Sequence, residues 1–208
     1  MKKLKPWKKV KITGYKRTSG SRGDPRKSIL IVCEGARTEP NYFNAFKCKS
    51  ARVDVDPAGA NTLALVRKAV KLKKDAEAFG QAYDQIWCVF DKDDFPLKNV
   101  CAAFKLAQQN DIQVAYSHES FELWYILHFN YMASAITRKD YIKKLTRLFG
   151  FDYKKDDPKM YQLLLEKQPK AIQHAKKLMT THSEDVHHAE KAPSTTVHIL
   201  VEELNKNL

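Results

Sequence analysis

The sequence predicts an α/β fold in which a four-stranded parallel sheet with flanking helices is followed by a helical C-terminal part. Up to about residue 118, short apolar runs alternate with longer segments of helical periodicity, which is typical of β-α units in a parallel sheet. From Glu119 onward only helical patterns follow. A hydrophobic content of 43% over 208 residues favours a substantial core, so we expect one sizeable domain with a helical extension.

The first two strands of the sheet are expected close together in the chain. Residues 28–33 are apolar from Ile29 to Cys33, which indicates a strand that is buried on both faces. Thr38 can cap the helix that follows, with Glu39 in its first turn. Residues 51–55 alternate only weakly between apolar and polar side chains, and we expect an edge strand there.

The other two strands each follow a helix. A long helix is expected from Asn61 to about Phe79, and the third strand, residues 85–90, is apolar from Ile86 to Phe90. Pro96 opens a helix that leads to the fourth strand. This strand is expected at 112–116, and further helices near 121–129, 138–149, 159–180 and 194–206.

Carboxylates follow both of the predicted buried strands. Asp91, Asp93 and Asp94 come after the third strand, and Glu34 comes after the first, with Gly35 to let the backbone turn sharply. Burying Asp91 unpaired inside a sheet would cost several kcal/mol. We therefore expect it just past the carboxyl end of the strand, where open α/β sheets bind ligands.

The spacing of these acids suggests a metal site. Asp91 and Asp93 are two residues apart, so an extended backbone directs both side chains to the same side. Two converging carboxylates suit a hard divalent cation such as Mg²⁺ or Mn²⁺. If both strands lie in one sheet, Glu34 faces the two aspartates, and a bound cation is the usual remedy for their repulsion. The alternative is an acidic turn that only caps the next helix.

The net charge of +13 is concentrated at the N-terminus. Residues 1–27 contain 11 Lys and Arg and one acid, so they carry +10 and leave +3 for the rest of the chain. Trp7 and Tyr15 lie among these charges. We expect a flexible basic arm that contacts nucleic acid, although a tail that only aids solubility is the alternative. The rest of the chain is expected to divide into an α/β core at 28–118 and a helical region packed on it at 119–208.

Cysteine usage and hydropathy indicate a cytoplasmic protein. The cysteines form no C-x-x-C pair, and two of the four, Cys33 and Cys88, fall inside predicted buried strands, as reduced core thiols do. No apolar run approaches the ~20 residues that a membrane span needs. The charged N-terminus also lacks the apolar stretch of a signal peptide, so we expect no membrane partner.

Two motifs resemble the Toprim domain, which is shared by topoisomerases, bacterial primases, overcoming-lysogenization-defect nucleases and some RNases. They are a strand ending in Glu34-Gly35 and a later strand ending in Asp91-Lys92-Asp93. A wider set of motifs resembles the RloB family over about residues 28–205. This set comprises Ile31-Val32-Cys33-Glu34-Gly35, Thr38-Glu39-Pro40-Asn41-Tyr42-Phe43, Tyr83-Asp84 through Trp87, Phe121-Glu122-Leu123-Trp124 with Leu127-His128-Phe129, and Pro193-Ser194-Thr195-Thr196-Val197.

The resemblance implies a Toprim-like, Rossmann-like sheet with helices on both faces, and Mg²⁺-dependent phosphodiester chemistry. Asp91 and Asp93 would hold Mg²⁺ or Mn²⁺. Glu34 would act as a general acid or base, or as a further metal ligand. The family is associated with bacterial restriction and abortive-infection loci, often beside an ATPase. The resemblance therefore implies an anti-phage nuclease that acts on RNA or DNA.

Further charged residues are candidates for the same site. Asp94, Glu39 and Glu122 could supply a second metal, and Glu39 and Glu122 could otherwise contact substrate. Glu39 could also serve only to favour a helix N-terminus. Arg37 and Lys92 lie beside the acids in the sequence and could bind a substrate phosphate.

Two other functions fit parts of the pattern. The chain could be a non-catalytic nucleic-acid-binding or sensor subunit that regulates a partner ATPase. A phosphoryl-transfer enzyme with Asp91 as its nucleophile would also carry Asp-x-Asp, as haloacid-dehalogenase-like phosphatases do. Those enzymes usually place the motif after their first strand, whereas here it follows the third.

Overall fold

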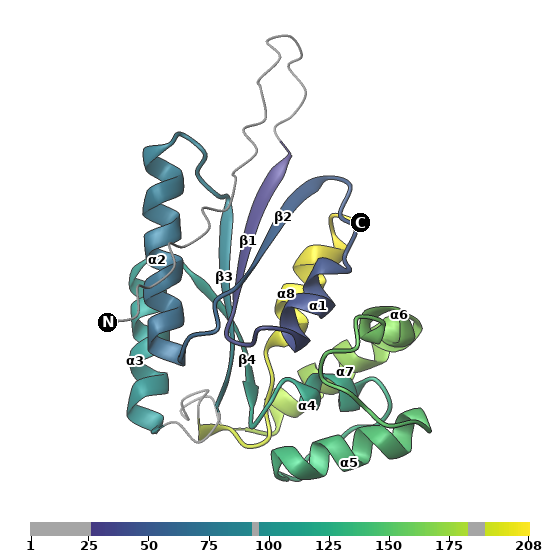
Figure 1. Cartoon of the computed structure of the whole chain (residues 1–208). Coiled ribbons are helices and arrows are strands. Elements are labelled where there is room, and N and C mark those ends of the chain that lie inside the picture. The colour runs from purple at the N-terminus through teal and green to yellow at the C-terminus, as the bar shows by residue number, and fades with distance from the viewer. Residues whose placement is uncertain (1–25, 93–95, 183–189) are drawn as a thin grey trace, which may run out of the picture.

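The computed structural model shows a four-stranded, all-parallel sheet with helices on both faces (Figure 1). It describes residues 26–92, 96–182 and 190–208. The strand order is β2-β1-β3-β4, so the predicted sheet and the edge position of the second strand are confirmed. The strands are β1 (Lys27–Cys33), β2 (Ala51–Pro57), β3 (Gln85–Lys92) and β4 (Gln113–His118).

Helices connect the strands and then form the C-terminal part. Those within the α/β core are α1 (Thr38–Asn44), α2 (Thr62–Ala78) and α3 (Leu97–Gln109). Those that follow β4 are α4 (Glu122–Leu127), α5 (Arg138–Phe149), α6 (Met160–Leu164), a 3-10 turn η1 (Leu165–Lys167), α7 (Gln168–Thr180) and α8 (Val197–Asn205).

The buried strands supply side chains to two separate cores. Ile29 and Ile31 of β1 point to the face covered by α1, α4, α7 and α8, whereas Leu30 and Val32 point to the face covered by α2 and α3. This alternation follows from the two-residue period of a strand. Burying one such side chain completely contributes roughly 1.5–3 kcal/mol, which is why both central strands are apolar along their buried stretches, residues 29–33 and 86–90.

Two helix boundaries differ from those predicted. Thr38 is the first residue of α1 and does not cap it, because its hydroxyl donates to the carbonyl oxygen of Lys155 at 3.0 Å. The helix expected over 159–180 is split into α6, η1 and α7. Pro169 explains the split, because proline lacks an N–H donor and its ring clashes with the carbonyl of Leu165 in a continuous α-helix.

The C-terminal segment returns to the sheet and covers its β4 edge. Thr195 forms an antiparallel bridge with Ser117, and the hydroxyl of Thr196 accepts a hydrogen bond from the backbone N–H of Tyr116 at 2.9 Å. At the other end of α8, Glu203 pairs with Lys27 of β1. The edge is therefore occupied within the chain and is not left open to another strand.

Two further expectations can be compared with the structure. All four cysteines are free thiols, as predicted. Among the described residues, no helix has both the length and the apolar character needed to cross a bilayer.

Candidate active site

The carboxyl ends of β1 and β3 meet at the point where the order of the strands reverses. The chain runs from β1 to its neighbour β2 on one side and then crosses to β3 on the other. In open α/β sheets such a reversal is where ligands bind, because the two outgoing connections separate and leave a crevice. Cys33 pairs with Val89, so the end of β1 brings Glu34 close to Asp91 of β3.

Glu34 is held by hydrogen bonds to both of its carboxylate oxygens. The backbone N–H of Asp91 donates to Oε2 at 3.2 Å, and the hydroxyl of Thr62 donates to Oε1 at 3.0 Å. Thr62 begins α2, whose preceding residue, Asn61, caps the helix by accepting from the N–H of Ala64 at 3.1 Å. The start of α2 therefore positions the Glu34 side chain, and the orientation of its carboxylate is fixed.

Asp91 lies inside β3 and not past its end, which corrects the expectation. Strand β4 extends further than predicted and pairs Asp91 with Ser117, so the ladder continues through the aspartate. Its Oδ2 atom accepts from the N–H of Phe121 at 3.1 Å, whereas Oδ1 is buried and has no hydrogen-bond partner among the described residues. Burial, followed by the negative charges of Glu39, Glu122 and Glu34, raises the pKa of Asp91 well above its usual value.

Glu39 is a buried carboxylate that packs against Gly35. A Cβ atom at Gly35 would lie only 2.2 Å from Glu39 Oε2, so the glycine is needed for this close approach. The backbone also bends at residues 34–37, as expected, and Gly35 makes this bend without a positive φ. Burial, with repulsion from Glu122 and Glu34, raises the pKa of Glu39 to about 7.

Glu122 is the fourth acid, and the side chains that bind it belong to the C-terminal part of the chain. It begins α4 and is almost completely buried. Its Oε1 atom accepts from the Tyr153 hydroxyl at 3.1 Å and pairs with Lys155 Nζ at 3.3 Å. Tyr153 and Lys155 lie on the loop between α5 and α6, so this loop closes one side of the site.

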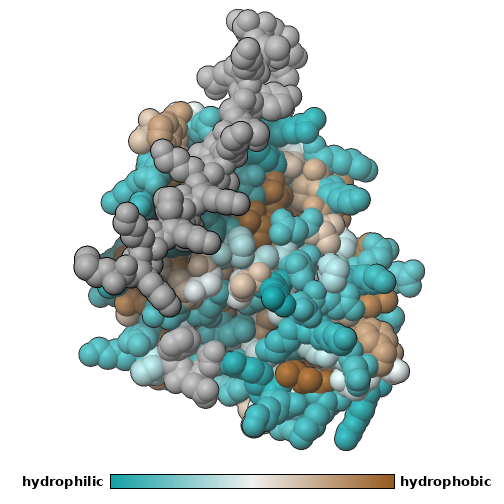
Figure 2. All heavy atoms as spheres, viewed as in Figure 1, coloured by the Kyte–Doolittle hydropathy of each residue, from teal (hydrophilic) through white to brown (hydrophobic). Residues whose placement is uncertain are grey.

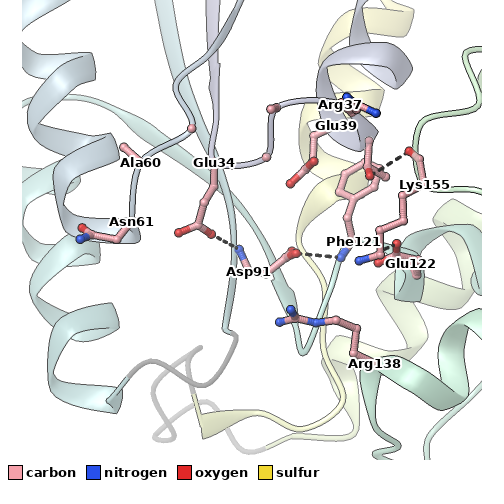
Figure 3. Close-up of a pocket in the computed structure, with 14 residues that line it drawn as sticks. Glu34, Arg37, Glu39, Ala60, Asn61, Asp91, Phe121, Glu122, Arg138 and Lys155 are labelled. Atoms are coloured by element: carbon pink, nitrogen blue, oxygen red, sulfur yellow. Dashed lines mark hydrogen bonds and ion pairs between the residues drawn. The ribbon is translucent and has the colours of Figure 1, made fainter. Parts of the chain in front are cut away.

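These side chains surround one cavity of about 570 Å³. In Figure 3, Glu34 and Asp91 point into it from the sheet and Glu39 from α1, while Lys155 and Arg138 approach from the C-terminal helical part. The cavity therefore combines four carboxylates with three cationic side chains. Its full lining is Glu34, Gly35, Ala36, Arg37, Thr38, Glu39, Gly59, Ala60, Asn61, Asp91, Phe121, Glu122, Arg138 and Lys155.

The predicted site residues are distributed unevenly around this cavity. Arg37 lies at the rim, where it pairs with the exposed Asp156 at 2.8 Å. Lys92 is the last residue of β3 and is not among the residues that line the cavity. Asp93 and Asp94 lie outside the described residues. Within the described ranges, no group of three or more His, Cys, Asp and Glu residues is arranged to hold a metal ion.

Arg138 and Lys155 are the charged lining residues that the sequence did not single out. Both belong to a stretch with many lysines and arginines, so neither stands out by residue type or spacing. Arg138 begins α5 and donates to the carbonyl oxygen of Glu119 at 3.3 Å. Only the packing of the C-terminal helices against the sheet brings the two cations to the cavity.

A protein-family model described as RloB-like protein matches residues 29–204, which is most of the chain. The matched segment contains all four carboxylates of the cavity, Glu34, Glu39, Asp91 and Glu122. No curated protein and no solved structure was found to match the chain.

Proposed function

The chain belongs to the RloB-like protein family, and from this and the geometry of the cavity we propose that it is a metal-dependent nuclease of the Toprim type that hydrolyses phosphodiester bonds in RNA or DNA. One observation carries the proposal. Four carboxylates converge where the strand order reverses, and the pKa values of Asp91 and Glu39 are raised by burial and mutual repulsion. Perturbed acids in a cleft are typical of functional sites.

Asp91 and Glu34 would supply part of the oxygen ligands that a hard divalent cation needs. Asp91 Oδ1 is buried beside other acids without a hydrogen-bond partner among the described residues, and a cation would satisfy it. Asp91 and Glu34 would hold Mg²⁺ or Mn²⁺ together with Asp93 and Asp94, and Glu39 would contribute to a second metal position with Glu122. When bound, the metal supplies a charge that neutralises the phosphate and the leaving oxygen.

The chain's own residues would share the remaining tasks. Glu34 would move a proton as a general acid or base, because its carboxylate is held in one orientation at the open end of the sheet. Arg138 and Lys155 reach the cavity from the C-terminal helical part, where Lys155 pairs with Glu122, and they would bind the oxygens of the substrate phosphate. Arg37 at the rim would contact an adjacent phosphate.

We place this activity in the cytoplasm and in anti-phage abortive infection, with a partner ATPase, on the strength of the loci in which the family is found. The basic arm would add affinity for nucleic acid through its charge. A non-catalytic sensor that controls the ATPase would share the arm and the cavity but would not cleave. Cleavage is therefore what separates the two functions.

The test is a cleavage assay on panels of RNA and DNA with Mg²⁺ or Mn²⁺, with and without a neighbouring ATPase. Asp91→Asn should abolish cleavage, because it removes a metal-binding charge. Asp111→Asn is the matched control, because Asp111 lies in an exposed turn before β4, at the opposite end of the strand. No cleavage under any condition, or full cleavage by Asp91→Asn, would favour the sensor.

A further inference from the structure

The helical segment next to the cavity carries a second concentration of positive charge. Residues 138–180, which include α5, α6 and α7, contain 12 Lys and Arg and five acids, a net charge of +7. Because residues 28–208 together carry only +3, the remainder of the folded part is net negative. Two of these cations, Arg138 and Lys155, line the cavity. The basic segment therefore adjoins the cavity and contributes two of its cations.

A row of aromatic rings runs from the surface of this segment to the wall of the cavity. Phe151 is 43% exposed, and its ring stacks on Phe149 with centroids 5.2 Å apart and planes 27° from parallel. Phe149 in turn stacks on Tyr153 at 6.4 Å and 13°. The Tyr153 hydroxyl donates to Glu122 in the cavity. The exposed ring is therefore the outer end of a rigid stack that begins at the candidate active site.

Lysines flank this row of rings. Lys154 and Lys155 follow Tyr153 in the chain and are exposed. Phe129 packs edge-on against Phe149 at 5.2 Å, and Lys167 Nζ lies 5.6 Å from the centre of the Phe129 ring. Figure 2 shows hydrophilic side chains over most of the visible face of α5 and α6, with isolated hydrophobic ones between them. An exposed ring among cations suits a ligand with flat apolar faces and a negative backbone.

We propose that residues 138–180 form the surface on which the substrate of the proposed nuclease docks, and that the substrate is single-stranded nucleic acid with one base stacked on Phe151. The inference deepens the proposed function. It rests on that function for the path of the nucleic acid, which would run from Phe151 towards the cavity. Phosphates would follow the lysines, as in other proteins that bind single strands through a basic groove and stacking rings. A base inside a duplex is already stacked and has no free face for Phe151.

The test compares Phe151→Leu with Phe79→Leu. Phe79 is a control of the same type, because it is 79% exposed but lies at the end of α2, away from the basic segment. Binding of the full chain to a fluorescent oligothymidylate, an oligouridylate and a blunt duplex is measured by anisotropy, with EDTA present so that nothing is cleaved. Raised salt weakens the phosphate contacts of the N-terminal arm and leaves stacking as a larger share of the affinity.

Phe151→Leu should bind both single strands roughly 5- to 100-fold more weakly, the range expected for losing one stacked base. It should bind the duplex as the wild type does and keep its melting temperature. Phe79→Leu should bind like wild type, and Phe151→Tyr, which keeps a ring, should restore binding. Unchanged single-strand binding by Phe151→Leu, or an equal loss with Phe79→Leu or with the duplex, would overturn the inference.

These outcomes are separable from those of the proposed function. Binding in EDTA needs no catalysis, so a sensor that never cleaves would still show the Phe151 effect if the docking surface is correct. A nuclease that cleaves and loses cleavage with Asp91→Asn, yet binds equally well with Phe151→Leu, would support the function and refute the docking surface.

Discussion

The backbone N–H of Asp91 donates a hydrogen bond to the Glu34 carboxylate at 3.2 Å, so the ends of β1 and β3 are joined through the very residues that bear the candidate chemistry. The bond couples the position of Asp91 to the orientation of Glu34. It also leaves the Asp91 carboxylate directed elsewhere, towards the N–H of Phe121. A substitution at Glu34 can therefore be designed to change its charge and keep this link.

Glu34→Gln should keep the fold and lose activity. The amide oxygen can accept from the N–H of Asp91, and the amide nitrogen can donate to the hydroxyl of Thr62, which then acts as an acceptor. Loss of general acid or base help typically lowers the rate ~10²- to 10⁴-fold. The measurement is cleavage in vitro, and toxicity in cells that carry the whole locus, at matched expression.

Glu77→Gln is the matched control, because Glu77 is exposed near the end of α2. The control should retain full activity. Full toxicity and cleavage by Glu34→Gln, with an unchanged melting temperature, would refute the catalytic assignment and favour the sensor. Nucleic-acid binding should persist in both variants, because neither change touches the basic arm.

The sequence predicts the sheet well because its strands are dictated by local pattern. An uninterrupted apolar run such as 29–33 is typical of a strand buried on both faces, and this predicts both the strand and its central position. Glu34 and Asp91 were found in the same way, as charges at the ends of such runs. Glu39 and Glu122 were predicted to join them, and the structure brings all four to one cavity.

The remaining features depend on packing between distant segments. Arg138 and Lys155 reach the cavity only because the C-terminal helices fold back against the sheet, and nothing local in the sequence marks them among the other cations. The position of Asp91 inside β3 depends on how far β4 extends beside it. The break in the helix expected over 159–180 does not depend on such packing. Pro169 is a local signal for a helix break, so the sequence alone is enough to predict it.

Gly35→Ala should disturb the cavity by displacing Glu39. The new Cβ would lie 2.2 Å from Glu39 Oε2, so the end of the Glu39 side chain must shift within the cavity that it lines. We expect a loss of stability of about 0.5–1.5 kcal/mol, the cost of forcing a side chain away from its preferred rotamer, and a loss of activity. Urea unfolding measures the first. In a Glu39→Ala background the same substitution should cost much less, and equal costs in both backgrounds would contradict the contact.

The buried Glu39 should make the metal-free protein less stable as the pH rises. Its pKa is about 7 in the folded state against 4.5 for the free group. Between these values the folded chain holds a proton that the unfolded chain has lost, so the free energy of unfolding decreases from about pH 4.5 to about pH 7. The total decrease from this group is on the order of 3 kcal/mol.

Unfolding by urea in EDTA at several pH values checks this, with Glu39→Gln for comparison. The variant cannot ionise at this position, so its stability should fall less over the same window. Asp91 contributes in the same direction, because its pKa is also raised, so some decrease should remain in the variant. If the free energy of unfolding fell equally with pH in wild type and Glu39→Gln, Glu39 would not be the group that causes the decrease.

Removal of the basic arm should weaken nucleic-acid binding without unfolding the protein, provided that the cut is made before β1. Lys27 belongs to β1 and pairs with Glu203 of α8, so a deletion of 1–27 would also remove a structural contact. Deletion of 1–25 removes nine Lys and Arg and one acid. The slope of binding affinity against salt concentration should become shallower. An unchanged slope would mean that the arm only aids solubility.

Mg²⁺ or Mn²⁺ should stabilise the protein and should do so through the acids of β3. A ligand that binds only the folded state adds about 2.7 kcal/mol at 100 times its dissociation constant. Part of this gain comes from relieving the repulsion that raises the pKa values of Asp91 and Glu39, so the gain should be larger above pH 7 than at pH 5. Thermal unfolding with added metal measures the stabilisation at each pH, and titration calorimetry measures metal binding.

The decisive variant is Asp91→Ala with Asp93→Ala, compared with Asp111→Ala in the exposed turn before β4. The double variant should lose both the heat of binding and the metal-dependent rise in melting temperature, whereas the control should keep both. Without metal, the stability of the double variant should fall less than that of wild type as the pH rises, because the variant lacks the charge that repels Glu39 and Glu122. Equal metal binding by the double variant and the control would place the metal elsewhere and remove the basis for the proposed chemistry.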